Sequence, residues 1–167
     1  GVFVREGALD DVLALVSEAP RRDLDAWAIA LYTARDEVLS RAEASTPDDP
    51  RAVGLCALSL ALGRVSPTPL AERAVARAEA LLDATRSEEV AAALIPLLAD
   101  AARPTSEAAV LRWLPTLGAE ALPAVVACGG AASAEVLLAA LVGGSRASWA
   151  MASPSAVGEA LYGNAAA

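Results

Sequence analysis

Three pairs of identical adjacent acids are the residues whose types could do chemistry, because two neighbouring carboxyl groups can share the work of moving a proton. The pairs are Asp10 with Asp11, Asp48 with Asp49, and Glu88 with Glu89. Each pair falls at the start of a predicted helix, where negative charge offsets the positive end of the helix dipole. We interpret the pairs as helix-start residues, and we predict no catalytic residue in this chain.

A second set of residues could bind a partner protein, because Trp and Arg are enriched at the centres of protein interfaces. Arg112 and Trp113 are neighbours in one predicted helix, and Trp149 and Met151 lie in the stretch SRASWAMASPS, which carries little charge. Since Trp is also a large core residue, burial within this chain is the alternative for both tryptophans. We predict these four residues as partner-binding residues.

The composition excludes several kinds of site. The chain contains no His and no Lys, and all 13 of its basic residues are Arg. It therefore cannot build a Ser-His-Asp or Cys-His site, an imidazole metal site, a Schiff base or a phosphate-loop Lys. We expect neither a metal nor another cofactor. The net charge of -8 also argues against a nucleic-acid partner, whose affinity comes mainly from clustered positive charge.

The two cysteines bear on the compartment. Cys56 and Cys128 lie in the apolar contexts GLCALSL and VVACGG, which predicts two buried free thiols in a reducing, cytoplasmic compartment. A disulfide or a reactive thiol is the alternative. The chain opens GVFVREG, without an initiator Met or a signal-peptide pattern, so we interpret it as a piece of a longer protein.

The hydrophobic pattern predicts an all-α fold of about eight to ten helices joined by short connections, which indicates antiparallel neighbours. We expect a short α-solenoid, with a compact helical bundle as the alternative. The whole chain is predicted to form one domain, with a lead-in at 1–7, N-terminal helices at 8–85, helix pairs at 87–144 and a last pair or tail at 145–167. The expected helices span residues 8–18, 23–44, 49–62, 68–84, 87–101, 107–117, 119–128, 133–142, 146–152 and 155–162.

Residues 49–83 resemble a tetratricopeptide-type helix pair. Gly63 stands at the expected turn, where it fits the C-terminal cap of the first helix. Small residues occupy the positions where helices of that family touch. These small residues are Ala57, Ala61, Ala71, Ala74 and Ala78.

Residues 111–144 resemble the HEAT family, particularly its shorter PBS-lyase-like version. Gly118 ends one helix, Ala121-Leu122-Pro123 opens the next, and Ser133 caps the partner helix. The Arg usual early in the second helix is missing, since Val136 and Leu137 occupy that place. The resemblance implies a scaffold that presents a surface to another protein.

Residues 121–158 contain only two charged residues, Glu135 and Arg146. A monomeric surface normally carries more charge, so these helices must be covered by this domain, by another chain or by a membrane. The interrupting Gly and Pro residues argue against a membrane span. We therefore predict a non-enzymatic interaction scaffold that binds another protein, a continuation of its own chain or a second copy. The alternatives are an accessory domain of an enzyme, which a pocket with an acid beside Arg would favour, and a self-assembling or membrane-active subunit.

Overall fold

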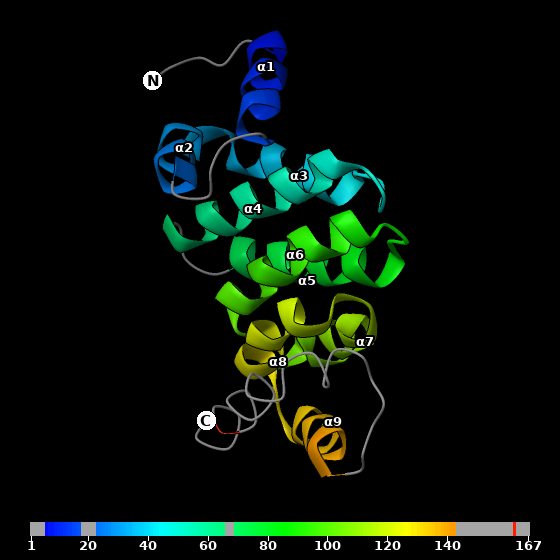
Figure 1. Cartoon of the computed structure of the whole chain (residues 1–167). Coiled ribbons are helices and arrows are strands. Elements are labelled where there is room, and N and C mark those ends of the chain that lie inside the picture. Colours follow the sequence, from blue (N-terminus) through cyan, green and yellow to red (C-terminus); the bar gives the residue numbers. More distant parts are fainter. Residues whose placement is uncertain (1–5, 18–22, 66–68, 143–161, 163–167) are drawn as a thin grey trace. The chain divides into compact units, whose positions relative to one another are not determined.

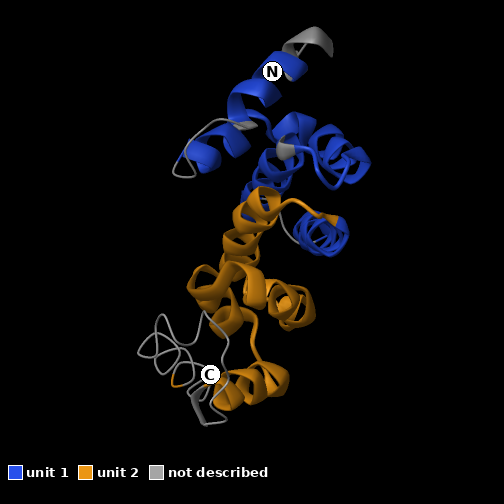
Figure 2. Ribbon diagram, turned by 45° about the vertical axis from the view of Figure 1, so that its right-hand side comes forward, with its two compact units in different colours: residues 1–84 blue, residues 85–167 orange. Residues whose placement is uncertain are grey.

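The computed structural model describes residues 6–17, 23–65, 69–142 and 162, and the regular structure of these residues is helical, without a β-strand among them (Figure 1). The all-α class is confirmed. The backbone contacts divide the chain into unit 1, residues 1–84, and unit 2, residues 85–167 (Figure 2). The division falls where the sequence predicts the boundary between the N-terminal helices and the HEAT-like pairs. That both units form one domain stays a prediction, and the predicted last helix pair lies outside the described residues apart from residue 162.

Unit 1 is built around α4, which contacts α1, α2, α3 and α5. No charged residue lies between Arg51 and Arg64, and every residue from 56 to 62 is buried. A helix that is apolar on all its faces must be covered on all sides, and the neighbouring helices supply that cover. The elements of unit 1 are α1 (Glu6–Ser17), α2 (Leu24–Ala30), the 3-10 turn η2 (Tyr32–Ala34), α3 (Arg35–Ala44), α4 (Pro50–Val65) and α5 (Pro69–Ala84).

The predicted long helix at 23–44 is wrong, because the chain bends after α2 and continues through η2 into α3. Leu31 lies at the bend and is buried, as are Val38 and Leu39 of α3. The bend allows α2 and α3 each to contact α4. Burial against α4 thus outweighs the continuous helical periodicity of this stretch.

The predicted helix end at Gly63 is also wrong, because α4 continues to Val65. Gly63 lies instead at a close approach of α4 to α5. A Cβ atom built on Gly63 would lie 2.7 Å from both the Cα and the Cβ atoms of Ala71. The alanines at 57, 61, 74 and 78 are buried, so small residues let the two helices approach. The helical periodicity of residues 68–84 predicts a buried stripe of Leu70, Ala71, Ala74, Val75, Ala78, Leu81 and Leu82. The structure buries all of them except Ala71, which is half-buried.

Unit 2 has α6 at its centre, in contact with both α7 and α8. Ser87 caps α6, because its Oγ accepts a hydrogen bond from the Val90 amide at 3.3 Å. Gly118 ends α7 with a φ of 59°, which confirms the predicted stop. The elements of unit 2 are α6 (Glu88–Ala101), η3 (Pro104–Ser106), α7 (Glu107–Leu117), η4 (Gly118–Ala121), α8 (Leu122–Cys128) and α9 (Ala131–Val142).

Ala102, directly after α6, is a position where replacement with Gly is expected to stabilise the protein. Ala102 has φ 49° and ψ 47°, the left-handed conformation that disfavours a Cβ. Replacing Ala102 with Gly is expected to raise the free energy of unfolding by about 0.5–1 kcal/mol, because the relief of strain exceeds the added freedom of the unfolded chain. Urea unfolding measures the change. Ala99→Gly, inside α6, is the control and should destabilise by about 1 kcal/mol; equal losses in both variants would contradict the prediction.

The predicted capping of the last described helix by Ser133 is wrong, because α9 begins at Ala131. Glu107 of α7 takes that role: its Oε1 accepts hydrogen bonds from the amides of Gly130 at 2.7 Å and Ser133 at 2.8 Å. The Ser133 hydroxyl is buried but itself makes no hydrogen bond of good geometry with a described residue. The hydrogen bonds to the Glu107 carboxylate therefore come from the two backbone amides. The Ser133 side chain, followed by the Ser133 and Gly130 amides, lowers the pKa of Glu107.

A lowered pKa makes this cap dependent on pH. Its stabilisation is present above the ordinary pKa of 4.5 and is lost as the pH falls through the lower folded-state value. At neutral pH, Glu107→Gln is expected to lose about 1 kcal/mol of stability. The difference in free energy of unfolding between this variant and the wild type should disappear at acidic pH. Unfolding measured between about pH 3 and pH 7 tests this. Glu120→Gln, at an exposed position of η4, is the control; a difference for Glu107→Gln that does not vary with pH would contradict the prediction.

Candidate functional site

A tight turn between α3 and α4 shapes one end of a cavity in unit 1. Thr46 precedes Pro47, and a residue before Pro avoids the helical conformation, so α3 ends at Ala44. The Asp49 amide then donates to the Thr46 carbonyl oxygen at 3.2 Å, which closes a β-turn with Pro47 in its second position. The chain therefore reverses direction, and α4 runs back in contact with α3.

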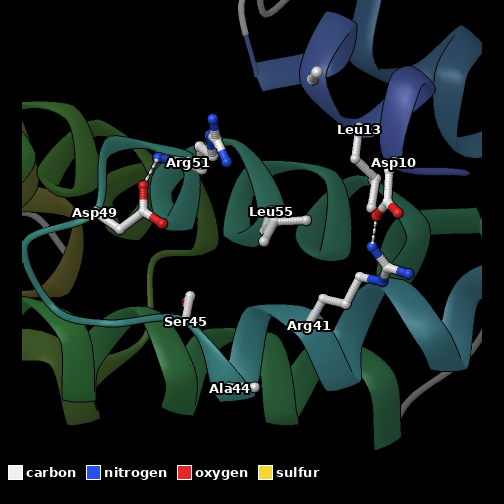
Figure 3. A pocket seen from close by; sticks show the side chains of 9 residues that line it. Asp10, Leu13, Arg41, Ala44, Ser45, Asp49, Arg51 and Leu55 are labelled. Carbon is white, nitrogen blue, oxygen red and sulfur yellow. Dashed lines mark hydrogen bonds and ion pairs between the residues drawn. The ribbon is translucent and has the colours of Figure 1, made fainter. Parts of the chain in front are cut away.

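The cavity lies among α1, α3 and α4 and has a volume of about 420 Å³ (Figure 3). This volume is typical of small-molecule sites. Figure 3 shows Asp10 and Arg41 at one end and Asp49 and Arg51 at the other, with Leu55 between them. The cavity thus has charged ends and an apolar middle. Its complete lining is Asp10, Leu13, Ala14, Arg41, Ala44, Ser45, Asp49, Arg51 and Leu55.

At one end of the cavity, the charges of Asp10 and Arg41 neutralise each other. Arg41 Nη1 pairs with Asp10 Oδ1, and Arg41 Nε donates to Glu37 Oε1 at 2.8 Å. The hydrogen bonds to Glu37 and Asp10 raise the pKa of Arg41 above its ordinary value. Glu37 and Arg41 stand four positions apart, the spacing that predicts an ion pair on one face of a helix, and the structure confirms that pair. The helix-start interpretation of Asp10 is wrong, because α1 already begins at Glu6 and the Asp10 carboxylate reaches α3 instead.

At the other end, Asp49 is a helix cap. Its Oδ1 accepts from the Arg51 amide at 2.9 Å, and its carbonyl oxygen accepts from the Ala52 amide at 2.9 Å. The helix-start interpretation is confirmed here, and also for Glu88 and Glu89 in the first turn of α6. Both carboxylates of the cavity therefore have structural partners, so the arrangement favours binding of a ligand over proton transfer.

The sequence did not identify this cavity, and the structure does not bring the predicted partner-binding residues to it. Arg112 is exposed and Trp113 is half-buried on α7, in unit 2. Trp149 and Met151 lie outside the described residues. The sequence offered only the local pair of Glu37 with Arg41 as a signal, because the lining comes from three separate helices.

The cysteines carry no reactive site. Cys56 and Cys128 are buried and free, as predicted. Burial raises the pKa of the Cys56 thiol to about 12, so the reactive thiolate is almost absent at neutral pH. Cys128 Sγ donates to the Leu98 carbonyl oxygen at 3.4 Å. Within the described ranges, no three Cys, Asp or Glu side chains gather closely enough to hold a metal ion.

One segment of the described chain, Pro104–Cys128, is long and apolar enough to cross a membrane by length and composition. It includes α7 and α8, with the break at Gly118 between them. The buried side chains of Leu114, Leu122 and Val125 belong to this segment, and buried core helices pass the same test. The cytoplasmic location stays a prediction.

Comparison of the chain with models of protein families, with curated proteins and with solved structures finds no match. The resemblances to HEAT and tetratricopeptide repeats therefore depend on the residues that carry them. Function must be inferred from the geometry of the two units.

Proposed function

We propose that the chain is a non-enzymatic interaction scaffold whose helices stack as a short HEAT-like α-solenoid. The supporting observation is the order of helix contacts within each unit. In unit 1, α2 and α3 each contact α4, and α3 and α4 each contact α5. In unit 2, α6 contacts α7 and α8, and α7 contacts α8 and α9. Contact with the next helix and the next but one is the pattern of stacked repeats. α1 departs from this pattern, because α4 is the helix that it contacts most.

Polar side chains follow the same order. Each of four links joins a helix to the next but one, and exposed ion pairs contribute only about 0–1 kcal/mol each. We therefore propose that these four links fix how the helices align with one another, and that they contribute little to overall stability. The links are Asp10 with Arg41, Asp25 with Arg64, Glu43 with Arg73, and Glu107 with the first amides of α9.

We place the partner on the Ile29 surface, which consists of Ile29, Tyr32 and Arg35. Ile29 is 66% exposed and Tyr32 is 38% exposed. The Arg35 guanidinium carbon lies 4.7 Å from the centre of the Tyr32 ring, and Arg35 Nη1 donates to the Tyr32 carbonyl oxygen at 3.0 Å. A large aliphatic side chain beside a Tyr stacked with Arg is typical of the centre of a protein interface. Arg112 and Trp113 remain a second predicted contact.

The test is capture of the partner by the full parent protein. Wild type should retain one protein in stoichiometric amount, and Ile29→Glu should lose it, because a buried unpaired charge opposes binding. Leu15→Glu places the same charge at another exposed position, in α1, and should retain the partner. Arg112→Ala with Trp113→Ala tests the second contact. If the Ile29→Glu variant retains the partner, the Ile29 surface is not the binding site. If the wild type retains no stoichiometric partner, the scaffold proposal is contradicted.

A helical accessory domain of an enzyme is the second candidate. The observation that favours it is the cavity of unit 1, which contains Asp10 beside Arg41 and has an apolar middle. An accessory domain of this kind would hold a ligand without transforming it, because Asp10 and Asp49 both have structural partners. Activity of the parent protein that depends on the cavity residues would support this candidate.

Self-assembly through the low-charge stretch is supported by the exposed Val136 and Leu138 of α9. Residues 143–158 of that stretch lie outside the described residues. Light scattering after size exclusion tests it: a monomer that binds no hydrophobic dye would contradict self-assembly.

A further inference from the structure

Arg51 is placed where it does not stabilise the fold. It lies in the first turn of α4, at the positive end of the helix dipole, where a cation is unfavourable. Its guanidinium makes no ion pair or hydrogen bond with any residue that the structure describes, and the side chain is exposed at the cavity. The guanidinium groups of other arginines in unit 1 have a carboxylate or a backbone carbonyl as a partner: Arg35, Arg41, Arg64, Arg73 and Arg77.

We propose that the cavity of unit 1 binds a short aliphatic carboxylate. The carboxylate of the ligand pairs with the Arg51 guanidinium, whose fork of N–H donors matches two carboxylate oxygens. The positive end of α4 favours the same negative charge. The hydrocarbon part of the ligand packs on Leu55 and Ala44, which lie between the two charged ends of the cavity (Figure 3).

The hydrogen bonds around the cavity favour an anion over a cation. Asp10 pairs with Arg41, and Asp49 Oδ1 accepts from a backbone amide. Ser45 Oγ donates to the Ala42 carbonyl oxygen at 2.6 Å, and the Ser45 carbonyl oxygen accepts from Arg77. Asp10, Asp49 and Ser45 therefore each have a hydrogen-bond partner in the protein, whereas the Arg51 guanidinium has none among the described residues. The positive charge of Arg51 would repel a ligand with an ammonium group.

The far end of the cavity limits the length of the ligand. There Asp10 and Arg41 form an ion pair (Figure 3). Glu37 also pairs with Arg41. A hydrocarbon chain that reached these groups would take charges out of water without pairing them, which is unfavourable. The apolar part must therefore end near Leu55, as in a short linear or branched acid.

The test uses three six-carbon probes that differ only in their head group: hexanoate, hexanol and hexylamine. Two-dimensional amide NMR of the full chain follows each titration. Hexanoate should give saturable shifts at the lining residues of α1, α3 and α4. Hexanol should bind about tenfold more weakly, which corresponds to the loss of about 1.4 kcal/mol from a charge-assisted pair. Hexylamine should give no saturable shift there.

Variants at the two ends of α4 identify the charge that matters. Arg51→Ala should bind hexanoate no better than hexanol. Its unfolding midpoint should be no lower than that of the wild type, because Arg51 lacks a partner in the described part of the chain and is a cation at the positive end of α4. Arg64→Ala removes an arginine from the other end of the same helix and should keep the preference for hexanoate. The proposal is overturned if hexylamine binds as well as hexanoate, if Arg51→Ala keeps the preference, or if no probe binds.

A free small acid and the terminal carboxylate of a polypeptide share this chemistry, and the proposal is for the small acid. N-acetyl-leucylglycine and its amide form the comparison. Weaker binding of this dipeptide acid than of hexanoate supports a small-molecule site. Binding of the dipeptide acid at least tenfold tighter than hexanoate would overturn that assignment in favour of a polypeptide end.

Discussion

Replacing Arg77 with Ala is expected to lower the free energy of unfolding by about 2–3 kcal/mol, because a charged donor serves two backbone acceptors at the end of α3. Arg77 Nε donates to the Ala42 carbonyl oxygen at 2.8 Å, and Nη2 donates to the Ser45 carbonyl oxygen. The Ala42 carbonyl oxygen also accepts from Ser45 Oγ at 2.6 Å, so the larger loss falls on the Ser45 carbonyl oxygen. Urea unfolding followed by circular dichroism measures the change.

Arg73 is a matched control one helical turn away on α5. It forms two hydrogen bonds with Glu43, at 3.0 and 2.8 Å, but its side chain is 53% exposed. An exposed ion pair contributes about 0–1 kcal/mol, so Arg73→Ala should have the smaller effect. Equal losses in the two variants would show that the carbonyls at the end of α3 do not need Arg77.

Gly63→Ala is expected to lower the free energy of unfolding by about 2 kcal/mol, although the same change usually stabilises a helix interior by about 1 kcal/mol. The reason is the approach of α5: the new methyl group would lie 2.7 Å from the Cα atom of Ala71. A backbone atom can yield only if the whole helix shifts, and α5 packs its buried side chains against α3 and α4. Overpacking therefore outweighs helix propensity.

Ala76→Gly measures the propensity effect separately, because Ala76 is an exposed position of α5. It should destabilise the protein by about 1 kcal/mol. A crystal structure of the Gly63→Ala variant would show whether α5 has moved. If Gly63→Ala instead raises the free energy of unfolding by as much as Ala76→Gly lowers it, the close approach of α4 and α5 is refuted.

The sequence predicts well what depends on neighbours along the chain. The buried stripe of α5, the stop at Gly118 and the pair of Glu37 with Arg41 all follow from spacing within one helix. The failures have a common cause. The bend at Leu31, the continuation of α4 through Gly63 and the capping of α9 by Glu107 depend on contacts between helices, which periodicity does not contain.

The candidate site could not be predicted from the sequence for the same reason. Asp10 and Arg41 are 31 positions apart, and packing in unit 1 joins them. Asp10 and Asp49 looked alike in the sequence, as members of acid pairs near helix starts. In the structure, one reaches another helix and the other caps its own. Local sequence determines which residues carry charge, and tertiary contacts determine what those charges do.

The links between a helix and the next but one also have a consequence for the order of folding. The Ser45 carbonyl oxygen, directly after α3, accepts from Arg77 only when α5 has arrived, and the first amides of α9 donate to Glu107 of α7. The end of α3 therefore lacks this donor until α5 has been made, whereas α9 finds Glu107 already present because α7 precedes it in the chain. Helices should become protected from hydrogen exchange in groups within each unit, so that folding is cooperative across several helices and does not proceed one helix at a time.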